Sequence, residues 1–89
     1  MDREKVARII ELIIKDEVGY DGIVTEDMHF VNDLQFDSLD SVELIMKLED
    51  EFSIAIDDEQ LEKIMTVRIA IDHVYNALCK SNIRERGKK

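Results

Sequence analysis

Apolar residues recur at three- and four-residue steps in three segments of this chain, and this spacing constrains the fold more than any other feature. It places the apolar side chains on one face of an α-helix, which must be buried against a neighbouring element. It predicts helices over residues 3–15 and about 38–52, and a last helix capped by Thr66. Residues 58–64 are predicted as a short additional helix. The residues that carry the pattern are Val6, Ile9, Ile10, Ile13, Leu44, Ile45, Leu48, Phe52, Val67, Ala70, Ile71, Val74 and Leu78.

A chain of 89 residues has room for one domain and one modest core. We find no internal repeat and no segment with the alternation of a strand. The predicted fold class is therefore all-α, a bundle of three long helices and one short helix. We expect the folded domain over residues 1–80, followed by a basic, disordered tail over residues 81–89.

A long connection is predicted over residues 16–36, where Gly19 and Gly22 interrupt the helical pattern. A connection of this length in a small domain is usually functional or held down by its own side chains. Its apolar residues favour the second interpretation, and we expect five of them to anchor it: Ile23, Val24, Phe30, Val31 and Leu34.

The net charge of −9 excludes nucleic acid as a natural partner, because a polyanion is bound through clustered Lys and Arg. Basic residues gather instead in residues 80–89, which hold five of them against one acid. The remaining acidic body favours basic partners and speeds encounter with them.

The single cysteine, Cys79, cannot form an internal disulfide, which fits a reducing compartment. No apolar run reaches transmembrane length, and the N-terminus lacks the apolar region of a signal peptide. We expect a cytoplasmic monomer without membrane insertion.

The segment 38–52 carries a second apolar stripe. At about 100° per residue, Leu39, Val42 and Met46 lie roughly 160–220° around the helix from Leu44. Acidic residues border this stripe: Glu43, Glu49 and Asp50. Either the helix is buried on both sides, or the stripe is an exposed docking surface with an apolar centre and a charged rim.

Ser38 lies at the predicted start of this helix, between Asp37 and Leu39-Asp40. Asp and Ser are ordinary helix-start residues, so one interpretation is that Asp37 is the N-cap and Ser38 has no chemical role. The other is that the exposed hydroxyl is an attachment point, and a phosphodiester would suit the positive end of the helix. His29 and His73 belong to no triad signature, so another enzyme would have to activate Ser38. We predict no catalytic residue and no enzyme activity.

The run from Phe30 to Leu44, which contains Asp37-Ser38-Leu39-Asp40, resembles the signature of the acyl carrier protein family. The resemblance continues through the acidic helix and covers roughly residues 3–78. It implies a four-helix acyl carrier domain over residues 1–80. It also implies that Ser38 receives 4′-phosphopantetheine from coenzyme A through a phosphopantetheinyl transferase, with Asp37 and Leu39 beside it.

The resemblance further implies that acyl groups travel as thioesters between enzymes that carry basic docking patches. The implied partner-binding residues are Leu39, Asp40, Val42, Glu43, Met46, Glu49, Asp50 and Ile56. We place a pocket for the acyl chain among Leu44, Leu48, Phe52, Ile64 and Ile71. Fatty acid biosynthesis is the predicted pathway, because Asp40 and the dense acids resemble that type. The alternatives are a specialised polyketide or aminoacyl carrier and an unmodified acidic helical adaptor.

Three loop positions depart from the family pattern. Glycine is common where this chain has Gln35 and Ser53, and proline is common where it has Asp57. These departures should alter the stiffness of the loops more than the chemistry. No metal site is predicted, because Asp57-Asp58-Glu59 lacks the glycine and spacing of an EF-hand loop. Clustered carboxylates could hold Ca²⁺ or Mg²⁺ loosely, but the sequence specifies no site.

Overall fold

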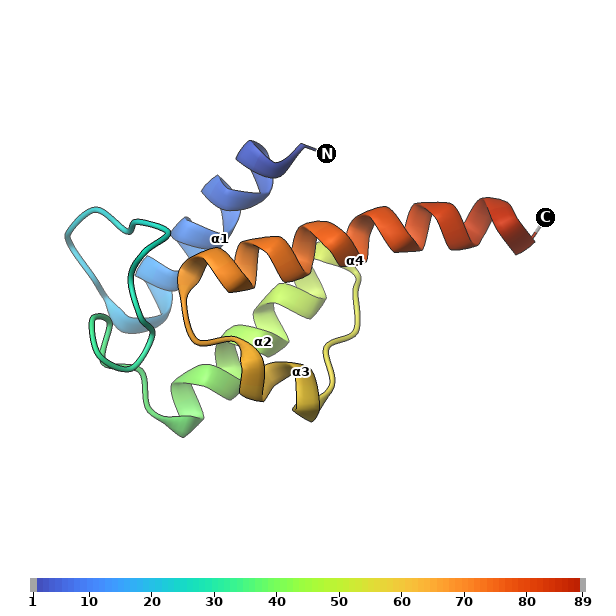
Figure 1. The fold of residues 1–89 in the computed structure, drawn as a ribbon. Helices are drawn as coiled ribbons and strands as arrows, with labels where there is room; N and C mark the ends of the chain where they lie inside the picture. Colours follow the sequence, from blue (N-terminus) through green and yellow to red (C-terminus); the bar gives the residue numbers. More distant parts are fainter. Residues whose placement is uncertain (1, 89) are drawn as a thin grey trace.

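In the computed structural model, four helices are joined by one long and two short connections (Figure 1). The structure describes the backbone of residues 2–88 and the side chains of residues 2–79. The helices are α1 (Arg3–Val18), α2 (Ser38–Phe52), α3 (Asp58–Lys63) and α4 (Val67–Lys88). Within the described residues the strand-like pairing is limited to an isolated bridge between His29 and Thr66. The predicted all-α fold with three long helices and one short helix is confirmed.

The ends of α1 are fixed by the residues that flank it. The Asp2 side chain accepts a hydrogen bond from the Lys5 backbone N–H at 2.9 Å, which satisfies a free donor of the first turn. At the other end Gly19 adopts a left-handed conformation with φ of 64° and donates its N–H to the Lys15 carbonyl. The helix therefore ends at Val18, three residues beyond the predicted end. The prediction was too short because the polar residues Lys15, Asp16 and Glu17 interrupt the apolar pattern, although Val18 after them still packs against the core.

The core lies between α1, α2 and α4, and α3 contributes no fully buried residue. In α1, Ile10 and Ile14 are fully buried, whereas Ile9 and Ile13 are only half-buried. The inward face of α1 is thus turned slightly from the predicted one. The largest fully buried side chains of the domain are Val6, Ile10, Ile14, Leu44, Leu48, Val67, Ile71 and Val74.

The connection between α1 and α2 is held down by its own side chains, as predicted, but not by all of those expected. Ile23 and Val31 are 80% and 57% exposed, so neither is an anchor. Phe36, which was not predicted, is buried, and its ring packs edge-on against Phe30 with the ring centres 5.1 Å apart. The buried side chains of the connection are Val24, Phe30, Leu34 and Phe36.

Backbone hydrogen bonds join this connection to the junction of α3 and α4. Phe30 donates its N–H to the Met65 carbonyl at 2.9 Å, and Val67 donates to the Met28 carbonyl at 3.0 Å. Segments far apart in the sequence are thereby locked side by side. The connection is an ordered part of the domain that fixes where α2 begins.

Ion pairs tie the connection to α1 and α4. Arg3 contacts Glu26 and Asp72, both at 2.8 Å. Arg68 contacts Asp27 at 2.8 Å and Glu26 at 3.3 Å. The Arg3 guanidinium hydrogen-bonded to Glu26 lowers the pKa of that carboxyl below its ordinary value.

The last helix starts as predicted, since the Ile69 N–H donates to the Thr66 hydroxyl at 3.3 Å. Its backbone continues to Lys88, beyond the other three helices (Figure 1). This helix thus runs over most of the segment that we predicted as a basic tail. The side chains after Cys79 lie outside the described residues, and the division into a domain of residues 1–80 and a tail of residues 81–89 stays a prediction.

Candidate functional site

Ser38 is the first residue of α2, and it is exposed. The preceding residue, Asp37, is the N-cap, and its carboxylate accepts a hydrogen bond from the Asp40 N–H at 2.8 Å. In return the Asp40 carboxylate accepts from the Asp37 N–H at 3.2 Å. This reciprocal capping box satisfies two backbone donors and holds the first turn of the helix in place. The two acids beside the serine therefore have a structural role.

The segment that precedes the N-cap residue Asp37 is also held in place. Leu34 and Phe36 are both buried, and the Phe36 N–H donates to the Phe30 carbonyl at 2.8 Å. Gln35 between them adopts a left-handed conformation with φ of 59°. The position where glycine is common in the resembling family is thus one where the backbone favours glycine. Ser38 therefore projects from a turn that is anchored on both sides.

The structure offers Ser38 no catalytic partner within the described side chains. The nearest histidine in sequence, His29, accepts hydrogen bonds at Nδ1 from the Val31 and Asn32 N–H groups at 3.1 and 3.3 Å. It stabilises a turn and is not oriented by a carboxylate as in a triad. An unassisted serine hydroxyl is a weak nucleophile, so chemistry at Ser38 would need a base from another protein.

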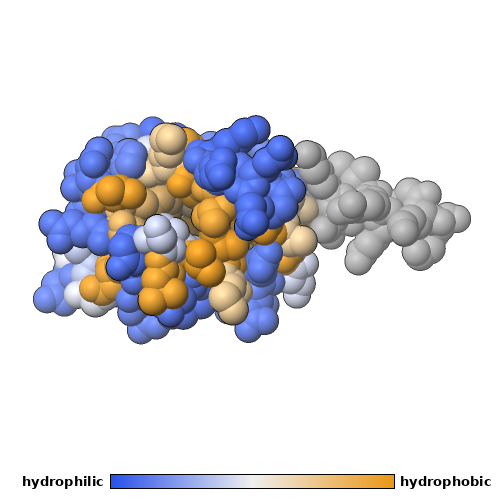
Figure 2. Space-filling view, turned by 90° about the horizontal axis from the view of Figure 1, so that it is seen from below, coloured by the Kyte–Doolittle hydropathy of each residue, from blue (hydrophilic) through white to orange (hydrophobic). Residues whose placement is uncertain are grey.

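The second stripe of α2 is exposed, which rules out burial of that helix on both sides. Leu39, Val42 and Met46 are 63%, 43% and 61% exposed, whereas Leu44 and Leu48 on the other face are buried. We call these three exposed residues the α2 strip. Figure 2 views the side of the molecule that carries the start of α2 together with α3, and hydrophobic residues gather there around a small hollow.

Two further exposed apolar residues lie in the α3–α4 junction and in the first turn of α4. Met65 is 55% exposed and Ile69 is 39% exposed. Ile69 was missed at the sequence level because it lies off the buried stripe of α4. A residue outside the buried stripe of a surface helix is ordinarily polar. An isoleucine at this position was therefore the signal from which an exposed apolar residue could have been predicted.

The acids around the α2 strip differ in what they do. Glu43 and Asp50 are exposed, but Glu49 is half-buried and accepts a hydrogen bond from the Ile56 N–H at 2.7 Å. Glu49 therefore holds the loop after α2. Ile56 itself is buried, so little of its side chain is available to a partner. Glu43 and Asp50 are therefore the exposed acids of the predicted rim.

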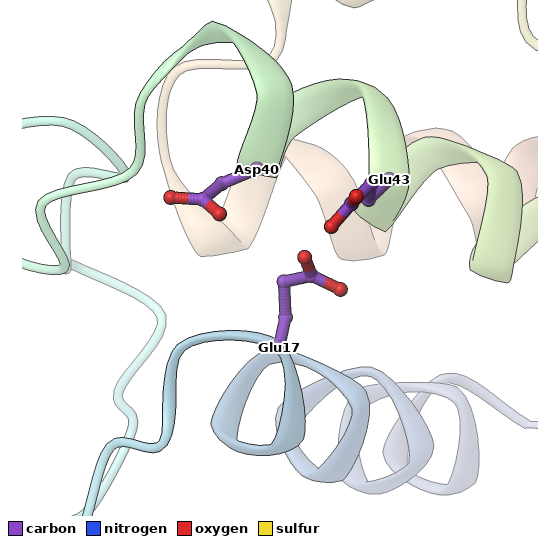
Figure 3. Close-up of side chains that lie close together, drawn as sticks. All are labelled: Glu17, Asp40 and Glu43. Atoms are coloured by element: carbon purple, nitrogen blue, oxygen red, sulfur yellow. The ribbon is translucent and has the colours of Figure 1, made fainter.

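A cluster of three carboxylates lies behind the start of α2 (Figure 3). Glu17, from the last turn of α1, points between Asp40 and Glu43 of α2. Lys47 contacts Glu17 at 2.8 Å and Asp16 at 3.6 Å. The Lys47 ammonium lowers the pKa of Glu17, whereas the Glu17 carboxylate raises the pKa of Glu43. The sequence did not indicate Glu17, which lies beyond the predicted end of the first helix.

The residues predicted to line an acyl pocket lie in and beside the core. Leu44, Leu48 and Ile71 are fully buried, Phe52 is buried and Ile64 is half-buried. Two surface cavities of the described part lie elsewhere. One of about 280 Å³ lies between α1 and the connection, and one of about 260 Å³ lies beside Lys47. The acyl pocket stays a prediction.

Comparison with known proteins identifies the family. The sequence profile described as "Phosphopantetheine attachment site" matches residues 7–74. The acyl carrier protein of Rubrobacter xylanophilus is 49% identical over 75 residues, which cover 83% of this chain and 93% of that protein. The chain belongs to the acyl carrier protein family. The solved structure of the acyl carrier protein from Thermotoga maritima superposes with a TM-score of 0.77 at 37% identity, covering 90% of this chain and 94% of that one.

Acyl carrier proteins are carriers and not enzymes, and their prosthetic group is phosphopantetheine. The site described above fits that group, since an exposed hydroxyl stands at the positive end of a 15-residue helix where a phosphate is stabilised. In the described residues, no helix has the length and apolar character that crossing a membrane requires.

Proposed function

We propose that this acyl carrier protein bears 4′-phosphopantetheine on Ser38 and carries acyl groups as thioesters on that arm. The observation that carries the proposal is the exposed Ser38 hydroxyl on a helix start fixed by the Asp37–Asp40 capping box. Loading joins the Ser38 oxygen to the phosphorus next to pantetheine in coenzyme A. The pyrophosphate bond breaks and adenosine 3′,5′-bisphosphate leaves, while the serine proton passes to a base of the phosphopantetheinyl transferase.

The bound group supplies a thiol on a flexible arm, and the protein residues supply position and recognition. Ser38 is exposed, so an arm attached there can reach a partner without displacing a core residue. The α2 strip lies immediately along the helix from Ser38 and gives a partner an apolar contact. Glu43 and Asp50 would steer partners with basic patches toward it.

This docking is expected to be weak, because each exposed ion pair contributes only about 0–1 kcal/mol. Weak docking suits a carrier that must leave each partner after one transfer. The proposed partners are a phosphopantetheinyl transferase and the fatty-acid-synthesis enzymes. The pathway assignment is supported by Asp40 directly after Ser38-Leu39 and by the density of acids along α2.

We further propose that the acyl chain enters the bundle among Leu44, Leu48, Phe52, Ile64 and Ile71. An apolar chain is poorly solvated in water, and Leu44 and Leu48 of α2 and Ile71 of α4 are fully buried apolar side chains. Octanoylation of the loaded protein should shift the methyl NMR signals of Leu44, Leu48, Ile64 and Ile71 and the ring signals of Phe52. Shifts confined to the α2 strip would contradict entry into the bundle.

We place the protein in the cytoplasm as a monomer. Its one cysteine, Cys79, is exposed, which is compatible with a reducing environment. Under oxidising conditions the same thiol would link two copies of the chain.

The loading reaction tests the proposal. Incubation with coenzyme A, Mg²⁺ and a broad-specificity phosphopantetheinyl transferase should add the mass of one phosphopantetheine group to the intact chain. Ser38→Ala should stay at the unmodified mass. Ser41→Ala, which removes the next serine along the same helix, is the matched control and should load normally. If the wild-type chain stayed unmodified, the carrier proposal would be wrong. The remaining interpretation would be an adaptor whose α2 strip binds partners without a prosthetic group.

A further inference from the structure

A groove of about 280 Å³ lies between α1 and the start of the connection, and we call it the α1 groove. Four of its residues belong to α1 and recur at the helical spacing i, i+3, i+4 and i+7, so they share one face of that helix. At about 100° per residue, this face is turned away from the buried residues Val6, Ile10 and Ile14. The residues that line the groove are Arg8, Glu11, Leu12, Lys15, Ile23 and Val24.

The middle of the α1 groove is apolar and open to solvent. Ile23 and Leu12 are 80% and 67% exposed, which makes them the most exposed large apolar residues of the described chain. Neither belongs to the core cluster, although Ile23 was expected to anchor the connection. Exposed apolar side chains that gather beside a hollow are typical of an interaction site.

Basic residues mark the two ends of this apolar centre. Arg8 and Lys15 are seven residues apart on α1, which is about 10.5 Å along the helix axis. Lys15 has no ion pair among the side chains that the structure describes, and Arg8 pairs at 3.5 Å with Glu4 in an exposed contact that contributes little. Glu11 is the one acid among the groove residues. It is half-buried, and burial raises its pKa.

This basic face stands out in an acidic molecule. Residues 1–79 contain seven basic residues, and four of them belong to α1. An occupant of the groove should therefore carry acids on both sides of an apolar centre, with a spacing that matches the two cations.

The α2 strip of a second copy of this chain has these properties. Glu43 and Asp50 are exposed and are also seven residues apart, which again is about 10.5 Å along the axis. Met46 lies between them and is 61% exposed, just as Leu12 lies between the two cations of the groove. Two helices laid side by side can thus pair both acids with both cations while their apolar centres meet.

We propose that the α1 groove of one copy binds the α2 strip of another copy. Because the two surfaces differ, the contact joins the copies head to tail. The contact is small and weak, so the chain is a monomer when dilute and associates near millimolar concentration. At physiological ionic strength the repulsion between the acidic bodies is screened beyond about 8 Å, whereas the pairs in the contact are closer than that. A strip held by the groove of another copy is unavailable to a partner enzyme, so association and partner docking compete.

Amide NMR signals of the unloaded protein test the contact. The series runs up to about 2 mM, where a contact with a Kd of that order is well populated. A reducing agent keeps Cys79 from linking two copies. We expect signals of the α1 groove and of the α2 strip to shift together as the concentration rises.

Two charge-reversed variants locate the surfaces. Arg8→Glu with Lys15→Glu reverses the groove, and Glu43→Lys with Asp50→Lys reverses the strip. Each variant alone should lose the concentration-dependent shifts, because its remaining native surface meets a reversed one of the same sign. A mixture of the two should regain them, since each reversed surface then meets one of opposite sign.

Lys63→Glu is the control for Lys15→Glu, because it makes the same charge change on exposed α3 and should keep the association. Arg8 is exposed, so Arg8→Glu alone keeps the groove arm valid if the double variant folds poorly. Signals that do not change with concentration, shifts of the α2 strip without the groove, or a mixture that fails to associate would each overturn the proposal. Loading of Ser38 does not enter this test, so the carrier proposal and this one can fail separately.

Discussion

Replacing Ser53 or Gln35 by glycine should stabilise this protein. Both residues adopt left-handed backbone conformations, with φ of 56° at Ser53 and 59° at Gln35. Ser53 ends α2, where its N–H donates to the Glu49 carbonyl, and Gln35 shapes the turn before Ser38. Both side chains are exposed, so their removal sacrifices little packing.

The magnitude follows from two opposing effects. A residue with a Cβ in the left-handed region costs about 1–2 kcal/mol. Glycine gives the unfolded chain more freedom, which offsets about 0.4–1 kcal/mol of that gain. We therefore expect each replacement to raise the free energy of unfolding by about 0.5–1 kcal/mol. For a domain of this size the corresponding rise in Tm is about 2–8 °C.

Urea unfolding followed by circular dichroism measures the change. Ser41→Gly is the matched control, because it makes the same chemical change in the helical part of α2. There glycine should destabilise by about 0.3–0.5 kcal/mol relative to serine. Ser53→Gly and Ser41→Gly should thus shift the midpoint in opposite directions. If both shifted it downward, the backbone argument would be wrong.

Two other predictions concern charge. Because Arg3 lowers the pKa of Glu26 below its ordinary value of 4.5, the ion pair contributes stability above that pH and loses it as the pH falls through the folded-state pKa. Glu26→Gln should therefore flatten the acid limb of a plot of Tm against pH, and an unchanged limb would exclude this pair as its cause. In the docking proposal, Glu43→Lys and Asp50→Lys should raise KM for transfer to partners with basic patches, more at low salt than at high salt. Asp21→Lys, in the connection, should leave KM unchanged, and equal effects of all three would point to net charge alone.

The helices were predictable because their apolar residues follow a regular period. Asp2, Asp37 and Thr66 signal the helix starts correctly, and all three accept capping hydrogen bonds. The end of α1 was not predictable from the apolar pattern. Gly19 sets this end, because its left-handed conformation closes the helix at Val18, three residues beyond the predicted end.

Burial within the connection was harder to predict, because no period applies there. Phe30 and Val31 are neighbours of similar hydrophobicity, yet one is buried and the other is 57% exposed. The backbone bond from Phe30 to Met65 decides which of them faces the core. Such a contact across 35 positions of sequence leaves no local signal.

Ser38 could be proposed as the attachment site from the sequence, but its surroundings could not be fully predicted. The segment around Ser38 carries both the helix-start pattern and the family signature. Glu17 is different, because only the packing of α1 against α2 brings it beside Asp40 and Glu43. Local contacts also distinguish the acids that were predicted to bind partners, since Glu49 accepts a hydrogen bond from the Ile56 N–H and Asp40 belongs to the capping box.

The central claim is that one hydroxyl, that of Ser38, receives the prosthetic group. Tryptic digestion of the loaded protein should release residues 16–47 as one peptide, which contains both Ser38 and Ser41. Fragmentation of this peptide by tandem mass spectrometry locates the added mass. We predict that the added mass lies on Ser38 alone. Phosphopantetheine on Ser41, or on any residue outside this peptide, would contradict the account.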